Sequence, residues 1–171
     1  TGLPTRQGQE ELNEAVFGGH GDFARIVLAA SEPTQCFYIM EKVFNLAERY
    51  QCPVFLVIDK MLAQSRYTVP QLDPSGFVID RGKLIESAEQ YAEIFKDGRE
   101  YKRYELTDDG ISYRAIAGTP GIHNYYTNTN EHTEDGYITE EEVVRQQQMD
   151  KRFMQRMELI RQLTQDPAYQ L

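Results

Sequence analysis

The sequence predicts an α/β protein built on a parallel sheet, and two observations carry that prediction. Two short apolar runs, RIVLAA at 25–30 and PVFLVID at 53–59, have the composition of strands that are buried on both faces. Between them lies a stretch with the period of an amphipathic helix. A strand, a helix and a strand within roughly 34 residues form a βαβ unit, in which the two strands lie parallel with a right-handed crossover.

The elements of this unit follow in order. Leu12, Ala15 and Val16 predict a helix over 9–17 that Gly18-Gly19 ends. After the first strand, Ser31 is the expected helix N-cap, with Pro33 in the first turn. The helix itself is predicted by an apolar stripe at three- and four-residue spacing: Cys36, Phe37, Ile39, Met40, Val43, Phe44, Leu46, Ala47 and Tyr50.

Beyond the second strand the pattern changes. Segment 67–82 holds prolines and glycines and is expected to be extended, as a chain crossing to another part of the protein. Residues 83–96 have a helical period with an irregular front end, and 101–134 show no sustained period.

Thr139 and Glu142 predict a capping box at the start of a long helix that continues toward Asp166. A helix of roughly 25 residues would be about 38 Å long. Its apolar positions include Met149, Phe153 and Met157, which would suit a partner surface if they were exposed.

Composition bounds the partners. The 171 residues carry a net charge of −9, which argues against nucleic acid as a partner because that role needs a basic surface. The longest apolar run, 54–58, is far too short to cross a bilayer, and no polybasic cluster indicates a membrane surface. Cys36 and Cys52 have no metal or redox spacing, so we expect buried thiols and a cytoplasmic location.

Read from the residues alone, the chain shows no self-sufficient active site. Glu131 and Thr133 do not fit a calcium loop over EHTEDGYITEEE, so a turn before a capped helix is favoured there. No zinc spacing links His20, His123 and His132, and structural hydrogen bonding is the favoured role for them. The acidic groups Glu10-Glu11, Asp108-Asp109 and Glu140 to Glu142 are expected to be solvated or to cap helices.

A family resemblance emerges from several longer motifs. TGLPTRQGQEEL resembles the loop and helix of the α subunit of 2-oxoacid:ferredoxin oxidoreductases, especially the 2-oxoglutarate type. The resemblance continues through FGGHGDFARIVLAAS, YKRYELTDDGIS, HNYYTNTNEHTEDGYITEEE and MDKR, so that it covers nearly the whole chain.

The resemblance implies an enzyme that oxidatively decarboxylates a 2-oxo acid. The α chain would pack over the pyrimidine of thiamine diphosphate. A β chain would bind the diphosphate through magnesium and carry the iron–sulfur cluster, or another chain would carry it. The implied partners are that β subunit, in an α2β2 assembly, with ferredoxin, the 2-oxo acid and coenzyme A. The two cysteines agree with a chain that holds no cluster of its own.

The same resemblance assigns the site residues. Cofactor-binding residues would be Thr1, Gly2, Leu3, Pro4 and Thr5, and Arg6 would lie next to the substrate. A helix N-cap for Thr5 and a solvated position for Arg6 remain the alternatives. No catalytic residue is assigned, and His20 and EHTEDG are expected to serve packing.

The family's Tyr-Pro-Ile-Thr-Pro segment, activating glutamate and substrate-gripping arginine are absent from this sequence. We therefore expect an internal piece of a subunit, inactive alone. Its expected parts are the second half of the pyrimidine-side domain (1–64), an irregular connector with a short helix (65–138), and a long helix leading to a further domain (139–171). Pyruvate or branched-chain 2-oxo acids are the alternative substrates. A non-catalytic assembly module is the alternative function, and a calcium-binding module is the third.

Overall fold

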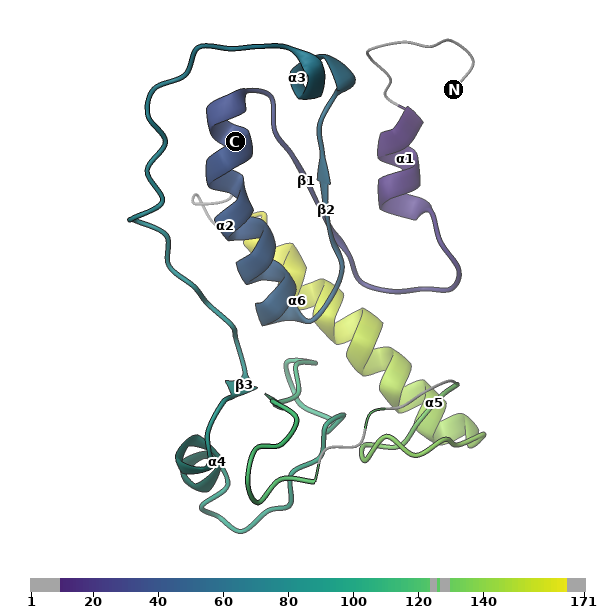
Figure 1. Cartoon of the computed structure of the whole chain (residues 1–171). Helices are drawn as coiled ribbons and strands as arrows, with labels where there is room; N and C mark the ends of the chain where they lie inside the picture. Colours follow the sequence, from purple (N-terminus) through teal and green to yellow (C-terminus); the bar gives the residue numbers. More distant parts are fainter. Residues whose placement is uncertain (1–9, 124–125, 127–129, 166–171) are drawn as a thin grey trace. The chain divides into compact units, whose positions relative to one another are not determined.

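The computed structural model describes residues 10–123, 126 and 130–165 (Figure 1). The chain forms two compact units, Thr1–Arg81 and Gly82–Leu171. The first holds α1 (Glu10–Phe17), β1 (Ile26–Ala29), α2 (Pro33–Tyr50), β2 (Val54–Val57) and α3 (Lys60–Gln64), and the second holds β3 (Leu84–Ile85), α4 (Ala88–Ile94), β4 (Arg114–Ala115), α5 (Glu142–Met149), the π-helical η1 (Asp150–Gln155) and α6 (Arg156–Leu163).

The predicted βαβ unit is confirmed in the first unit. β1 and β2 pair in parallel, with Ile26 opposite Val54 and Ala29 opposite Val57. Helix α2 connects them and packs against β2. It places Ile39, Leu46 and Tyr50 in the core. In the described part of the chain this sheet has two strands.

The start of α2 differs from the prediction. Glu32, not Ser31, is the N-cap, and Pro33 opens the helix. The backbone N–H and the hydroxyl of Ser31 instead donate to Oε1 of Gln35, at 2.7 and 3.1 Å. The hydroxyl of Ser31, which we expected to cap the helix, is thus bonded to the side chain of Gln35 instead. At the other end Gln51 adopts a left-handed conformation, with φ 49°, which ends the helix and turns the chain into β2.

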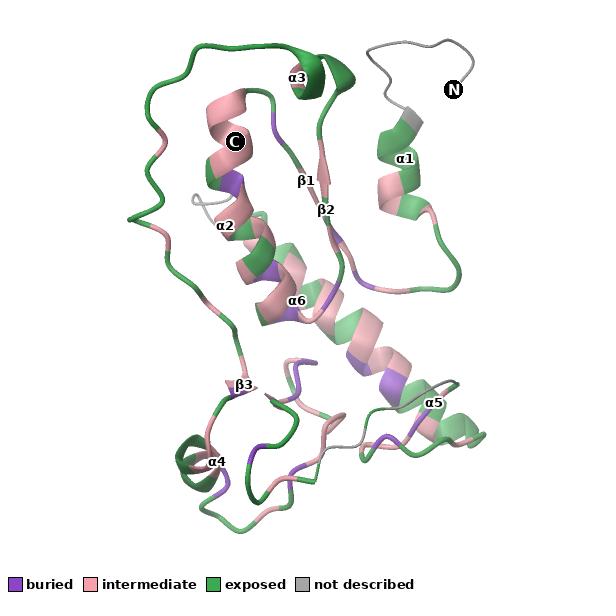
Figure 2. Cartoon of the chain, viewed as in Figure 1, coloured by how far each residue is buried: buried purple, intermediate pink, exposed green. Residues whose placement is uncertain are grey.

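Segment 65–83 contains no helix or strand, as predicted for an extended connection. Figure 2 shows it mostly exposed. Its residues up to Arg81 belong to the first unit, where side chains of α2 hold them.

The second unit contains a strand that the sequence pattern did not predict. β3 precedes α4 and pairs in parallel with β4. Ile85 is fully buried and forms a small core with Phe95, Tyr101 and Ala115. The irregular front end expected for 83–96 is the strand β3, and the helical part is α4. The strand itself was not predicted, because a buried isoleucine in a two-residue strand fits either period.

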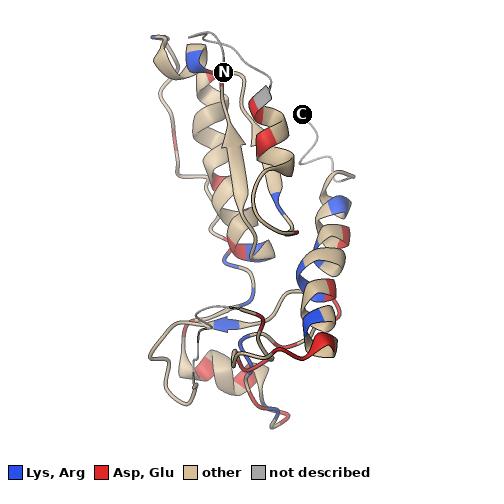
Figure 3. Ribbon diagram, turned by 90° about the vertical axis from the view of Figure 1, so that its right-hand side faces the viewer, with Lys and Arg blue, Asp and Glu red and all other residues tan. Residues whose placement is uncertain are grey.

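The long helix of the second unit is confirmed, but its start is not. It runs over 142–163 through α5, η1 and α6, and Figure 3 shows both signs of charge along it. The capping box is wrong: Glu141 is the N-cap without a side-chain bond, and Thr139 Oγ1 accepts from the N–H of Glu141 at 3.2 Å. The π-helical turn, Asp150–Gln155, was also not predicted.

Burial corrects one surface and supports the view of the thiols. Met149, Phe153 and Met157 are half-buried, whereas Val143 and Met154 are the exposed large apolar residues of the helix. The thiols of Cys36 and Cys52 are free, the first half-buried and the second buried. None of the described helices is both long and apolar enough to traverse a membrane.

Candidate functional site

The carboxyl ends of β1 and β2 form the first candidate site. Because the strands are parallel, these ends lie at the same edge of the sheet, where open α/β sheets bind ligands. The N–H of Ala30 donates to the carbonyl of Val57 at 3.2 Å and keeps the two strands paired up to that edge. Beyond the edge, the segment after β1 turns into α2, and the segment after β2 reaches α3 through Asp59.

The polar side chains at this edge hold the loops in place. Thr34 Oγ1 donates to Glu32 at 2.9 Å, and Asp59 caps α3 by accepting from the N–H of Leu62 at 2.6 Å. Together with the Ser31 and Gln35 bonds, these contacts fix both turns. The side chains of Ser31, Thr34, Gln35 and Asp59 are thus engaged within the two turns, so their role here is to position the loops.

The six predicted site residues lie outside the described residues: Thr1, Gly2, Leu3, Pro4, Thr5 and Arg6. They precede α1 in the sequence, with residues 7–9 in between, and α1 contacts β1. How α1 is held is therefore the part of this site that the structure describes.

The FGGHGDFAR stretch anchors the end of α1. The guanidinium of Arg25 donates to the carbonyls of Ala15 and Gly18 and lies 3.9 Å from the centre of the Phe23 ring. A cation that satisfies the last carbonyls of a helix stabilises its C-terminus. A Cβ on Gly18 would come within 2.5 Å of the carbonyl oxygen of Glu14, so glycine is required there. His20 is exposed on this loop, and the packing role expected for it remains a prediction.

A second candidate lies in the other unit, around the motif EHTEDG. Residues 131–139, which we call the histidine hairpin, are closed by backbone bonds from Thr133 to Tyr137 (2.9 Å) and from Thr139 to Glu131 (3.0 Å). The hairpin is tied to 104–106, because Glu134 accepts from the N–H groups of Tyr104 and Leu106, both at 2.8 Å. The motif therefore joins segments distant in sequence.

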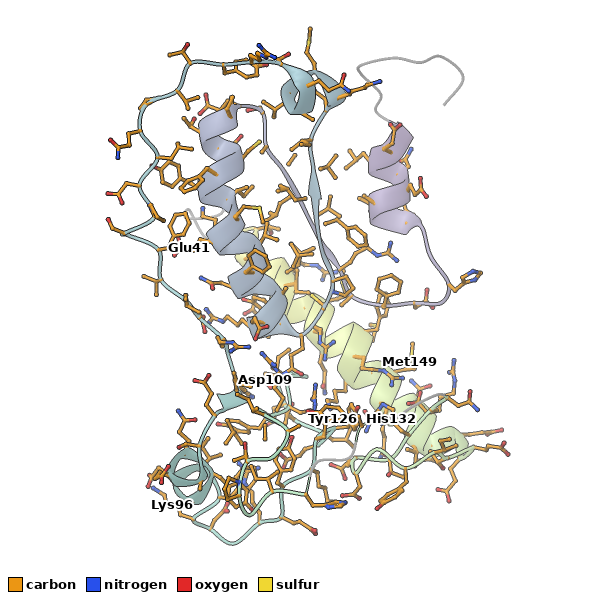
Figure 4. All side chains as sticks on the ribbon, in the orientation of Figure 1. Glu41, Lys96, Asp109, Tyr126, His132 and Met149 are labelled. Atoms are coloured by element: carbon orange, nitrogen blue, oxygen red, sulfur yellow. The ribbon has the colours of Figure 1, made fainter. Side chains whose placement is uncertain are left out.

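Arg152 of η1 joins this hairpin to the long helix. Its guanidinium makes two bonds with the carboxylate of Glu131, at 2.9 and 2.6 Å, and contacts Nε2 of His132 at 3.3 Å. It also donates to the sulfur of Met149; Figure 4 labels His132 and Met149. Burial is the largest influence on Glu131 and disfavours its charge, but the hydrogen bonds from Arg152 and from the N–H of His132, together with the electrostatic attraction of these two residues, outweigh burial and lower the pKa of that carboxyl.

His132 is buried and serves packing, as expected. Its ring lies 4.1 Å from the ring of Tyr104, and its Nδ1 lies 2.9 Å from the carbonyl of Thr133. Burial lowers the pKa of His132, so the neutral ring is favoured, with Nδ1 donating to Thr133. A neutral ring held at both nitrogens is a structural element.

Lys151 is the most perturbed titratable group described. It is 4% exposed, and its Nζ donates to the carbonyl of Tyr104 at 2.8 Å. Burial first, and then the nearby Arg156 and Arg103, lower the pKa of Lys151 to about 7. Its neighbour Gln148 donates to the same carbonyl at 3.2 Å. Buried groups with perturbed pKa values occur at functional sites and in structural networks alike, and the contacts here are with backbone.

The remaining predicted positions are also placed. His123 is exposed at a cavity of ≈ 260 Å³ whose lining includes Lys102, Arg103 and Asp135, a set of mixed charge. Asp109 pairs with Lys83 at 2.7 Å, while 40% of its side chain stays exposed to solvent. Within the described ranges no three acidic, histidine or cysteine side chains are grouped to hold a metal ion.

Comparison with known proteins places these elements in context. The family described as pyruvate flavodoxin/ferredoxin oxidoreductase, thiamine diphosphate-binding, matches residues 1–152. The α subunit of 2-oxoacid:ferredoxin oxidoreductase 2 of Aeropyrum pernix is 42% identical over 89% of this chain and 22% of its own. The 2-oxoglutarate synthase subunit KorA of Archaeoglobus fulgidus is 33% identical over 65% of this chain and 30% of its own.

A solved structure is similar as well. It is the 2-oxoglutarate:ferredoxin oxidoreductase from Magnetococcus marinus with 2-oxoglutarate, coenzyme A and succinyl-CoA bound. It is 36% identical with a TM-score of 0.77, over 94% of this chain and 26% of that one. The chain thus spans about a quarter of the length of that protein, and 22% of the Aeropyrum relative.

Sequence reasoning missed Gln148, Lys151 and Arg152, which carry the network of the second unit. One signal was available: Gln148 and Lys151 are three residues apart and so share one face of the predicted helix. A polar pair inside an apolar period indicates buried hydrogen bonding, provided that a partner carbonyl lies opposite. The partner, Tyr104, is 47 positions before Lys151 and has no local signal.

Proposed function

The chain belongs to the thiamine diphosphate-binding family of pyruvate flavodoxin/ferredoxin oxidoreductases, and we propose that it is part of the α subunit of an enzyme that oxidises 2-oxoglutarate. The reaction would yield succinyl-CoA and carbon dioxide and pass electrons to ferredoxin. The observation that carries this proposal is the similarity to the Magnetococcus marinus enzyme, whose solved structure contains 2-oxoglutarate, coenzyme A and succinyl-CoA.

The proposed place of this chain is the pyrimidine side of the thiamine site, at the carboxyl ends of β1 and β2. Thiamine diphosphate, when bound, supplies the nucleophilic carbon and the electron sink for decarboxylation. The described residues at this edge fit a supporting role, because Ser31, Gln35 and Asp59 hold the turns. Ligand contacts would then fall to the loop of Thr1, Gly2, Leu3, Pro4 and Thr5.

We assign the first residues separate roles. Gly2 and Pro4 would shape the loop so that its backbone approaches the cofactor. Arg6 would bind a carboxylate of the substrate, since a guanidinium pairs with carboxylates through two hydrogen bonds. Arg25, by holding the end of α1, would fix the direction in which that loop enters the site.

The whole enzyme would contain further chains. We propose a β subunit that shares the thiamine diphosphate and its magnesium and that carries the iron–sulfur cluster, unless another chain does, in an α2β2 assembly with ferredoxin as acceptor. Residues 1–64 would be the second half of the pyrimidine-side domain. A cytoplasmic location agrees with the two free thiols.

A broader substrate range is the second candidate. The relatives with the higher identities are named only as 2-oxoacid:ferredoxin oxidoreductases, whereas those named for 2-oxoglutarate are less identical over the shared region. Pyruvate and branched-chain 2-oxo acids therefore belong in any test of specificity.

The test is ferredoxin reduction by an assembled enzyme whose α subunit carries this sequence. With thiamine diphosphate and coenzyme A present, we expect kcat/KM for 2-oxoglutarate to exceed that for pyruvate by at least about tenfold, since a second carboxylate adds a charged contact. Equal rates would favour the broader enzyme. Absence of reduction with every 2-oxo acid would contradict an enzymatic role and favour an assembly module.

Arg6 gives a residue-level version of this test. We expect Arg6→Ala to raise KM for 2-oxoglutarate about tenfold or more, because a charged hydrogen bond to substrate is lost, and Arg6→Lys to have a smaller effect. Arg66→Ala, an exposed arginine elsewhere in the same unit, is the matched control. If Arg6→Ala and Arg66→Ala gave the same KM, Arg6 would have no substrate role.

A further inference from the structure

The outer face of α2 carries an apolar groove. It has a volume of ≈ 440 Å³ and lies between α2 residues 40–48 and the extended residues 77–81. We call it the α2 groove. Its large apolar side chains are open to solvent: Phe44 is 64% exposed, Val78 67% and Ile79 82%. Apolar side chains gathered in this way mark interaction surfaces on soluble folds.

The segment that forms one wall of the groove is held firmly. Asn45 of α2 donates from Nδ2 to the carbonyl of Val78 at 2.6 Å and accepts from the N–H of Asp80 at 3.0 Å. Glu41 accepts from the N–H of Val78 at 2.7 Å; Figure 4 labels Glu41 on α2. The asparagine amide thus acts as a neighbouring strand would, and fixes the backbone while the side chains of Val78 and Ile79 stay outside.

This arrangement favours a rigid docking surface. A loose loop would bury its apolar side chains by folding back, whereas a pinned backbone keeps them presented. A surface that is preorganised loses less conformational entropy on binding. The ring of Phe77 also lies 5.5 Å from the ring of Phe37 on α2, and this contact adds to the anchoring of segment 77–81.

The rim of the groove is acidic. Its lining contains the three carboxylates of Glu41, Glu48 and Asp80 against the single guanidinium of Arg81. Arg81 lies 3.4 Å from Glu48 and Arg49 lies 3.7 Å from Asp80, so two of these carboxylates are paired with guanidinium groups. In the described contacts Glu41 accepts from a backbone N–H, so the excess negative charge of the rim is at Glu41. Charge complementarity therefore favours an occupant with lysine or arginine beside its apolar side chains.

We infer that the α2 groove is the docking site for an apolar segment, flanked by lysine or arginine, of the companion subunit of the same enzyme. The inference rests on the proposed function for the existence of that subunit. In this proposal Val78 and Ile79 are exposed because they contact the docked segment, and the acidic rim favours a segment that carries positive charge.

The first test is cysteine protection at Val78, in an α subunit of the relatives' length that carries this sequence. Val78→Cys is labelled with maleimide, and the modified peptide is quantified with and without the purified companion subunit. Val143→Cys is the matched control, because Val143 is 68% exposed and lies in the other unit. We expect the companion subunit to slow labelling at position 78 at least about tenfold and at position 143 less than about twofold.

Other outcomes overturn the inference. Equal labelling at position 78 with and without the companion subunit means that it does not cover the groove. If the cysteine at position 78 of a monomeric α subunit is already labelled more slowly than the one at position 143, the subunit's own chain fills the groove. If labelling at position 78 slows only when α subunits dimerise, a second copy of the α subunit fills it. Equal protection of positions 78 and 143 means that the effect is not specific to the groove.

The second test addresses charge. Val78→Glu and Val78→Lys should both weaken assembly, as measured by the dissociation constant in analytical ultracentrifugation, by at least about tenfold. Val78→Lys should raise the dissociation constant more than Val78→Glu does, because a lysine repels a basic segment. The same pair at Val143 should change the constant less than about twofold. If Val78→Glu raised the dissociation constant more than Val78→Lys, the occupant would not be basic.

These tests separate the inference from the proposed function. If the enzyme without substitutions reduces ferredoxin, and the variants of Val78 assemble as well as those of Val143, the proposed function is supported and the docking site is rejected. An assembly that protects position 78 and turns over no 2-oxo acid removes the function and keeps the interface.

Discussion

In the first unit α2 leaves Phe44 exposed beside Val78 and Ile79, whereas in the second unit the long helix buries Gln148 and Lys151 against the carbonyl of Tyr104. The first helix has apolar side chains in solvent, and the second has an amide and an amine in its buried face. The same local pattern, an amphipathic helix, thus has two different environments.

The difference indicates how each unit is completed. Exposed apolar surface on α2 is suited to burial by another chain. In the second unit the long helix is tied to the histidine hairpin by Arg152 and to the loop at Gly110 by Arg156, whose Nη2 donates to the Gly110 carbonyl at 3.1 Å. We therefore expect the second unit to depend on its own buried polar contacts, and the first to change most on assembly.

The largest effect should come from Gly110. Its φ is +71°, and a Cβ there would lie 2.7 Å from the carbonyl oxygen of Lys151 and 3.3 Å from the N of Arg156. We expect Gly110→Ala to reduce the free energy of unfolding by ~4 kcal/mol, from conformational strain plus the clash. Gly98→Ala, at φ +83° with open space around it, should cost ~1 kcal/mol. Urea denaturation checks both, and equal costs would mean that the loop does not pack closely on the helix.

The core of the first unit comes next. Leu46 is 2% exposed, and Phe44, two residues away on α2, is 64% exposed. Leu46→Ala should cost ~3 kcal/mol through lost burial and a cavity, and Phe44→Ala less than ~0.5 kcal/mol. Thermal denaturation measures the pair. A large cost at Phe44 would show that the outer face of α2 is already covered within this chain.

The bridge from the long helix to the hairpin should have a moderate effect. Arg152→Met removes both bonds to Glu131 and leaves that carboxylate half-buried without its cation. We expect a loss of ~2 kcal/mol, below the value for a fully buried pair because the arginine side chain is 32% exposed. Arg161→Met, which breaks an exposed pair with Glu158, should change stability by less than ~0.5 kcal/mol. Similar losses for the two variants would contradict the bridging role.

Lys151 should make the second unit sensitive to pH. The unfolded chain keeps this proton up to a pKa of 10.5, whereas the folded chain releases it above a pKa of about 7. Between these values the unfolded state binds more protons, so stability rises with pH, by at most ~1.4 kcal/mol per pH unit. His132, whose pKa burial also lowers, acts in the same direction below its ordinary range.

The matched variant is Lys151→Met. It keeps the apolar stem and removes the charge, so the rise of the unfolding temperature between pH 7 and pH 9 should flatten, with circular dichroism as the readout. A profile that stays as steep in Lys151→Met would assign the pH dependence to other groups.

How far the sequence predicted this structure depended on whether the signal was local. β1, α2 and β2 were predictable because apolar period and strand composition lie within each segment. β3 was missed because Ile85 owes its burial to Ala115 and Phe95, and the start of α5 was missed because Thr139 bonds to Glu141 instead of entering a helix. The π-helical turn has no sequence pattern of its own.

The candidate site was predictable in a different sense. Thr1 to Arg6 were assigned through resemblance, and they lie outside the described residues, so their roles remain predictions. The chemistry of the second unit was not predictable, since Lys151 owes its lowered pKa to burial and to the distant Arg103. The residues alone predicted a turn at EHTEDG and structural hydrogen bonding for its histidine, and the packing role came from the resemblance. The contacts of Glu131 and His132 with Arg152 agree with both.

The most direct measurement of the contrast between the units is hydrogen exchange on an α subunit carrying this sequence, with and without its companion subunit. We predict that amides of α2 and of 77–81 slow at least about tenfold on assembly, while those of 131–139 and of η1 change less than about twofold. Equal slowing in both units, or slowing confined to the hairpin and η1, would contradict the account.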